Sequence, residues 1–122
     1  MSEHDEQVAL FNLLSLYESK YPVLKWIHAI PNGGHRHMAV AKRMKAEGVR
    51  AGVWDIFVPV AVDDKSGLYI EMKFDDNKLT GNQQQFREGV GDAYSWEVCY
   101  TSVEAARAIG KYLDIDELKQ VR

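Results

Sequence analysis

The stretch at residues 68–75, LYIEMKFD, constrains the fold more than any other part of the chain. Its apolar residues occupy every second position, which is the period of a β-strand with one buried face. Such a strand places Tyr69, Glu71, Lys73 and Asp75 together on the opposite face, with Glu71 and Lys73 roughly 7 Å apart by the strand rise. Taken alone, this pattern favours a solvent-facing, salt-bridged face of an antiparallel sheet.

The same Glu-x-Lys spacing recurs at Glu18/Lys20 and Glu117/Lys119. These copies lie in segments with helical periodicity, where residues two apart point to nearly opposite sides. Asp-x-Lys pairs at positions 63/65 and 76/78 lie in predicted turns. Only residues 68–75 combine the spacing with a strand.

A second predicted strand spans residues 55–62 and is followed by the turn signal DDKSG at 63–67. In a hairpin that pairs odd positions with odd positions, Asp55 and Glu71 lie on one face. Two carboxylates brought together repel unless a cation lies between them. Hard oxygen ligands of this kind suit Mg²⁺ or Mn²⁺. Lys73 beside them can orient a water, help to deprotonate it and offset charge in the transition state of phosphodiester hydrolysis.

The other periodicities predict helices at residues 2–20, 35–47, 80 to about 90 and 101 to about 113, and strands at 25–30 and 94–101. The order α-β-α-β-β-α-β-α describes a mixed α/β fold. A length of 122 residues with 46% hydrophobic content suits one domain, 1–122, with a buried core. The single cysteine, Cys99, fits a reducing compartment, and the acidic start MSEHDEQ is no signal peptide. We therefore expect a cytoplasmic protein.

A third acidic residue, Glu6, falls within the apolar stripe of the first predicted helix at positions 10, 13, 14 and 17. We therefore expect its side chain to point inward. Glu3 lies close in angle and is the alternative. A glutamate in a first helical turn is also favoured simply by the helix dipole.

Positive charge is concentrated between residues 35 and 50, although the whole chain has a net charge of −3. Five cations face a single acid, Glu47, in this segment. One interpretation is a solvated helix face, and the other is a phosphate-binding surface on an otherwise acidic protein. The cations are Arg36, Lys42, Arg43, Lys45 and Arg50.

Five motifs occur in the order and at the spacing of the VRR-NUC domain. They are EQVALF at 6–11, PNGGHR at 31–36, MKAEGVRAGVWD at 44–55, LYIEMK at 68–73 and LTGNQQQF at 79–86. From residue 3 to 113 the chain resembles this family, which belongs to the PD-(D/E)XK nuclease superfamily, and it is most similar to the small phage and bacterial members. The resemblance implies a restriction-endonuclease-like core, with a mixed β-sheet flanked by helices.

Carried over by position, the resemblance implies that Asp55 and Glu71 bind the metal and that Lys73 is the catalytic lysine. It also implies that Glu6 is the glutamate of the first helix and that Gln83 is the glutamine after the second catalytic strand.

One position departs from the superfamily pattern, and another has a second interpretation. The Pro-Asp of the superfamily is here Trp54-Asp55, which puts only the local backbone shape in doubt, because proline does no chemistry. Gln83 has a structural interpretation too, because Thr80-Gly-Asn-Gln83 is a capping box in which Gln83 bonds back to the Thr80 amide. Both roles of Gln83 can hold together.

The segment PNGGHRH at 31–37 predicts a turn into a helix. A zinc site made by His35 and His37 is disfavoured, because no cysteine or further histidine has ligand spacing. A third interpretation places the segment on the DNA side, with backbone amides at a helix N-terminus meeting a phosphate. The predicted DNA-binding residues are Asn32, His35, Arg36, Lys42, Arg43 and Lys45.

The favoured interpretation is a Mg²⁺- or Mn²⁺-dependent deoxyribonuclease. Small stand-alone members of the family resemble homodimeric enzymes that cut four-way (Holliday) junctions, and a two-fold dimer would set two active sites against a two-fold junction. The enzyme alternative is a flap or other branched-DNA nuclease. The alternative from another class is a DNA-binding module that has kept the fold and lost the reaction, and the intact Asp55, Glu71 and Lys73 set argues against it.

Overall fold

The computed structural model describes residues 2–31 and 37–122. Its centre is a sheet in the order β1-β2-β3-β4, formed by β1 (His28–Ala29), β2 (Ile56–Val58), β3 (Leu68–Met72) and β4 (Ser95–Cys99). The first three strands are antiparallel neighbours, whereas β4 runs parallel to β3. The sheet is therefore mixed, as predicted.

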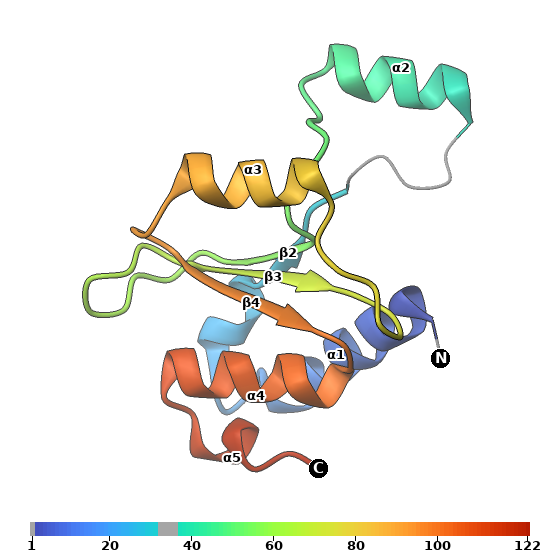
Figure 1. Ribbon diagram of the computed structural model, residues 1–122. Helices are drawn as coiled ribbons and strands as arrows, with labels where there is room; N and C mark the ends of the chain where they lie inside the picture. The colour runs from blue at the N-terminus through green and yellow to red at the C-terminus, as the bar shows by residue number, and fades with distance from the viewer. Residues whose placement is uncertain (1, 32–36) are drawn as a thin grey trace.

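Helices cover both faces of the sheet (Figure 1). α3 (Gly81–Val90) lies on one face, α1 (Glu3–Tyr17) and α4 (Ser102–Leu113) lie on the other, and α5 (Asp116–Lys119) packs against α4. α2 (Met38–Ala46) projects from the body of the molecule and has no buried residue. No helix among the described residues is long and apolar enough to cross a membrane.

The predicted order of elements is confirmed, with two additions and two strands much shorter than expected. Of the strand predicted at 55–62, only Ile56–Val58 forms β2. α5 was not predicted. The segment 25–30, expected to be a strand, begins instead within a 3₁₀ helix, η1 (Pro22–Trp26), and only His28 and Ala29 pair with β2. Pro22 favours this helical start, because a proline in the first turn gives up an N–H that would have no helical partner.

The two faces of β3 pack against different layers. Its apolar side chains at positions 68, 70 and 72 are at most 1% exposed and belong to the core shared with α1 and α4. On the opposite face, Tyr69 stacks on Trp96 with ring centroids 4.9 Å apart and meets Phe86 of α3 edge-on. Glu71 follows Tyr69 on this covered face and is only 2% exposed. The solvent-facing salt-bridged face is therefore not what this sequence forms.

The hairpin of β2 and β3 has the register under which Asp55 and Glu71 were expected to share a face. Phe57 pairs with Tyr69 and Ile56 with Ile70, so odd positions face odd positions. Continuing this register by one residue brings Asp55 opposite Glu71. The strand pairing thus carries both carboxylates to the same end of the sheet.

Candidate active site

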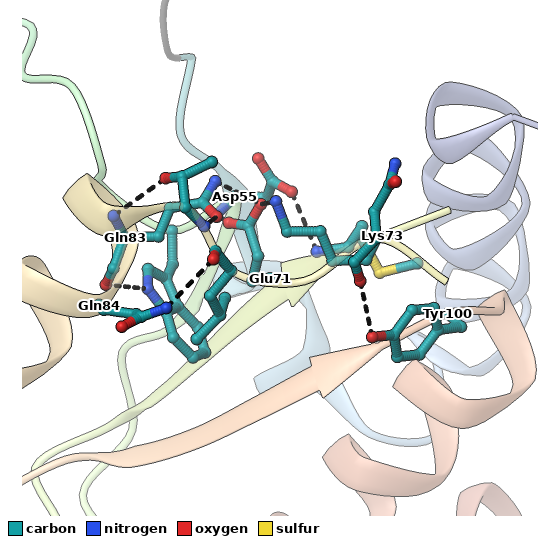
Figure 2. A network of polar contacts seen from close by, with 11 residues as sticks. Asp55, Glu71, Lys73, Gln83, Gln84 and Tyr100 are labelled. Atoms are coloured by element: carbon teal, nitrogen blue, oxygen red, sulfur yellow. Dashed lines mark hydrogen bonds and ion pairs between the residues drawn. The ribbon is translucent and has the colours of Figure 1, made fainter. Parts of the chain in front are cut away.

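Asp55 and Glu71 are joined by hydrogen bonds that continue the β2–β3 pairing. The Asp55 backbone N–H donates to Glu71 Oε1 at 3.2 Å, and the Met72 N–H donates to Asp55 Oδ2 at 3.0 Å. Each carboxylate is thus held by a backbone amide of the neighbouring strand, and Figure 2 shows the two side chains within one polar network. The two strands fix the separation of the carboxylates.

Lys73 extends the group along β3. Its Nζ lies 3.6 Å from Glu71 Oε2, and its backbone N–H donates to Cys99 O of β4 at 2.9 Å. Both side chains of this ion pair are nearly buried, at 8% and 3% exposure, whereas Lys20 and Glu117 form a pair on the surface. A buried charge persists only when it is paired or used, so this pair differs in kind from the surface ones.

Gln83 reaches the same carboxylate from α3. Its Nε2 donates to Glu71 Oε2 at 2.9 Å, while its Oε1 accepts the Thr80 N–H at 2.9 Å. The Thr80 Oγ1 completes a capping box by accepting the Gln83 N–H. The cap that the sequence indicated is therefore present, and the same side chain also contacts the carboxylate group (Figure 2).

The environment of Glu71 disfavours its charged form. Burial and, next, the neighbouring Asp55 carboxylate raise the pKa of Glu71 to about 8, and Lys73 only partly offsets them. A divalent cation between the two carboxylates would remove this penalty, and two carboxylates with water and phosphate oxygens suffice for Mg²⁺. Among the described residues, no group of three or more His, Cys, Asp or Glu could hold a metal ion. Asp55 and Glu71 instead form a two-carboxylate donor set, which fits a cation whose remaining ligands are water and phosphate.

A cavity of about 680 Å³ opens beside this group. Asp55, Glu71, Lys73 and Gln83 line one side of it, and the first turns of α1 line the other, among them His4, Gln7 and Phe11. Sequence reasoning missed the α1 residues. Their helical spacing marks the flank of the apolar stripe, but nothing in that spacing says what the flank faces.

The structure places Glu3, and not Glu6, on this cavity. Glu6 Oε1 instead accepts the Ser102 N–H at 2.8 Å, where α4 begins. This contact satisfies one of the amides that the first turn of a helix leaves without a partner. The half-buried position expected for Glu6 is observed, but its carboxylate is directed to α4, and the alternative, Glu3, has the better position for a role at the cavity.

The fold as a whole is similar to that of a solved structure described as a VRR_NUC domain protein. The two superpose with a TM-score of 0.73 over 93% of this chain and 89% of that one, at 22% sequence identity. This is the fold of a VRR-NUC domain. The expected restriction-endonuclease-like α/β architecture is thereby confirmed. No protein-family model and no curated protein sequence matches the chain.

The VRR-NUC fold leaves α2 outside the compact body, and the predicted DNA-binding residues divide accordingly. Lys42, Arg43 and Lys45 are exposed on α2. The other three, Asn32, His35 and Arg36, lie outside the described residues.

The free energy of unfolding of the metal-free protein should fall as the pH rises from about 4.5 to about 8. Because the folded-state pKa of Glu71 is raised, the folded protein keeps a proton that the unfolded chain releases in this window. Urea titrations in EDTA at a series of pH values measure the effect. Glu71→Gln is the reference, since it cannot titrate there, and a wild type that follows the same pH curve as this variant would contradict the prediction.

Proposed function

We propose that the protein is a divalent-metal-dependent deoxyribonuclease that hydrolyses phosphodiester bonds in branched DNA. The observation that carries the proposal is the placement of Asp55, Glu71 and Lys73 together on one cavity, with the lysine 3.6 Å from a carboxylate whose pKa is raised. Perturbed carboxylates at a cavity are typical of catalytic sites. The likeness to a VRR_NUC domain protein supports the same reading.

Asp55 and Glu71 are the residues that would hold Mg²⁺ or Mn²⁺. When bound, such an ion acts as a Lewis acid on a phosphate and lowers the pKa of water. Their backbone hydrogen bonds keep the two carboxylates in place without the ion. A site of this kind binds the cation with little rearrangement of the strands.

Lys73 contributes a fixed positive charge at the cavity wall. A buried ammonium can stabilise negative charge that develops on the phosphate and can hold a water for attack. Gln83 donates to Glu71 and thereby fixes the orientation of that carboxylate. Glu3 lines the same cavity and is therefore the acidic residue of α1 that can support the reaction from its present position. A catalytic role of Glu6 would require its carboxylate to leave the Ser102 N–H at the start of α4.

Branched DNA fits the distribution of charge. The exposed cations of α2 lie on a projecting helix, so they can reach phosphates beyond the duplex segment at the cavity. A two-fold homodimer would double this surface and set two sites against a four-way junction. A flap nuclease is the enzyme alternative.

A DNA-binding module without activity is less consistent with the buried group. Glu71 is buried beside the partly exposed Asp55, and two neighbouring carboxylates cost stability when no cation neutralises them. A protein that only binds DNA gains nothing from keeping Asp55 and Glu71 together.

Incubation with Mg²⁺ or Mn²⁺ and labelled junction, flap, nicked and linear duplex DNA tests the proposal. We expect cleavage that EDTA abolishes and that is fastest on the junction. Faster cleavage of flaps would select the alternative enzyme, and binding without cleavage under any metal would select the inactive module.

Replacing Lys42, Arg43 and Lys45 together with alanine should weaken binding to every DNA substrate. Each lost phosphate contact should also reduce the slope of log K against log salt by about one unit. The cavity residues are unchanged, so cleavage should partly return at high enzyme concentration. Fluorescence anisotropy over a salt series measures both quantities.

The matched control removes three cations at α4 and α5, on the other side of the sheet: Lys111, Lys119, and Lys20, which pairs with Glu117 of α5. This variant should keep the wild-type salt slope. An unchanged slope in the α2 variant would mean that α2 is only a solvated helix. A variant that becomes monomeric in sedimentation would make α2 the dimer contact, and a wild type that is monomeric even with junction DNA would refute the dimer.

A further inference from the structure

Two indole N–H groups fasten α3 to the rest of the fold, one near each end of the helix. Trp54 Nε1 donates to Gln83 O at 3.0 Å in the first turn, and Trp96 Nε1 donates to Gly91 O at 3.0 Å at the C-cap. The two rings also meet edge-on at 4.9 Å. Chemically the two attachments are the same, but only the first is next to the carboxylate group.

The first attachment joins the residue before Asp55 to the backbone of Gln83. Trp54 is 1% exposed and follows a loop that packs directly on α3, since a Cβ at Gly52 would lie 2.4 Å from Asn82 O. Gly52 also has φ +90°, which favours glycine. The loop that carries one carboxylate is thus held against the helix turn that carries the amide.

The helix cap determines which end of the Gln83 side-chain amide faces Glu71. Gln83 Oε1 accepts the Thr80 N–H, so Nε2 is the atom left to face Glu71 Oε2. The other oxygen of Glu71, Oε1, accepts the Asp55 N–H. One oxygen of the carboxylate is thus oriented through the β2–β3 pairing, and the other by an amide whose position depends on how α3 packs on residues 52–55.

We propose that Trp54 is a positioning residue, whose indole N–H holds the first turn of α3 so that the Gln83 amide orients the Glu71 carboxylate for a cation. The effect of this hydrogen bond on metal affinity rests on the proposed function, whereas its effect on the Gln83 amide does not. The plain alternative is a buried tryptophan that contributes to packing only. Trp96 makes an equivalent bond away from the cavity and so provides the comparison.

Trp54→Phe and Trp96→Phe each keep an aromatic ring and remove one indole N–H. The Gln83 side-chain amide signal in ¹⁵N NMR, assigned by its loss in Gln83→Ala, should move toward that of a free amide only in Trp54→Phe. Mn²⁺ affinity by calorimetry should fall about tenfold in that variant, the usual scale for groups that orient a metal ligand. In Trp96→Phe both quantities should stay at wild-type values.

A double variant tests whether the effect passes through Gln83. If it does, Trp54→Phe should weaken Mn²⁺ binding no further once Gln83→Ala is present. Full additivity of the two losses would overturn the proposed route.

Gly52→Ala provides a second route, should Trp54→Phe not fold. It pushes the loop off α3, whereas Gly91→Ala carries the same φ of +90° with no atom within 4 Å of the added Cβ. The amide signal and the Mn²⁺ affinity should change in Gly52→Ala alone.

The outcomes separate the positioning role of Trp54 from the proposed function of the protein. An amide signal unmoved in Trp54→Phe, or moved equally in Trp96→Phe, overturns the positioning role. A wild type that binds no Mn²⁺ overturns the proposed function, and the NMR comparison then still decides whether Trp54 positions Gln83.

Discussion

Replacing Asp55 with asparagine should abolish DNA cleavage and, without metal at pH 8.5, raise the melting temperature of the protein. The substitution preserves shape, and the asparagine oxygen can still accept the Met72 N–H that Asp55 Oδ2 accepts. What it removes is the charge of a proposed metal ligand and the repulsion that helps to raise the pKa of Glu71 to about 8. Above that pH both carboxylates are ionised in the wild type, so losing one charge stabilises the fold.

The loss of cleavage should be about 10³-fold or more, because the cation contributes several kcal/mol of transition-state stabilisation and each 1.36 kcal/mol is tenfold in rate. The gain in melting temperature should be about 2–5 °C, the size expected from removing a modest repulsion in a small domain. Added Mg²⁺ should stabilise the wild type but not Asp55→Asn. Single-turnover cleavage and scanning calorimetry measure these quantities.

Asp114→Asn is the matched control, because Asp114 is an exposed aspartate in an ion pair with Lys119. It should leave cleavage unchanged and should not stabilise the protein. Wild-type turnover by Asp55→Asn would refute the metal-site assignment. A variant that is inactive and also less stable at pH 8.5 would show that Asp55 is chiefly structural.

If Asp55→Asn gains stability while it loses activity, then function, and not folding, explains why the two carboxylates lie together. Function commonly retains groups that the fold alone would exclude. Here the β2–β3 register brings Asp55 opposite Glu71, and Gln83 of α3 then contacts the buried Glu71. The fold itself thus generates an electrostatic strain that a bound cation would relieve.

The hairpin and its register could be predicted because both depend on local rules. Alternation of apolar residues sets the faces of β3, and a one-residue slip would have moved Ile70 out of the core. The covering of Glu71 could not be predicted in this way. It depends on α3 packing on this face of the sheet, where Phe86 meets Tyr69, and no periodicity in either segment specifies that contact.

The orientation of Glu6 shows the same limit within one helix. The wheel placed it in a broad apolar stripe, and it is indeed half-buried. Its partner, however, is the Ser102 amide, 96 residues away in the chain. Glu3, the alternative, faces the cavity because the N-terminus of α1 extends past the end of β3. Helical spacing gives the angle of a side chain but not the neighbour that lies there.

Replacing Lys73 with methionine should lower the cleavage rate about 10²- to 10⁴-fold, the usual contribution of a positioned acid or base. Methionine fills a similar volume at this site, where Lys73 is 7% exposed, so the fold should persist. The loss has two sources. The Lys73 ammonium no longer acts at the cavity. It also no longer lowers the pKa of Glu71, which should then rise above about 8, so that a proton on Glu71 competes with the metal.

Measurements at two pH values separate these sources. At pH 7 the variant should lose both Mn²⁺ affinity and rate, because Glu71 holds its proton more tightly. At pH 9.5 a larger share of Glu71 is ionised in both proteins than at pH 7, so the affinity should move toward that of the wild type while the rate stays low. Lys20→Met, which breaks the surface pair with Glu117, should be neutral at both pH values. If the rate of Lys73→Met recovered together with metal affinity at high pH, the lysine would serve only to keep Glu71 ionised, and its direct role at the phosphate would be refuted.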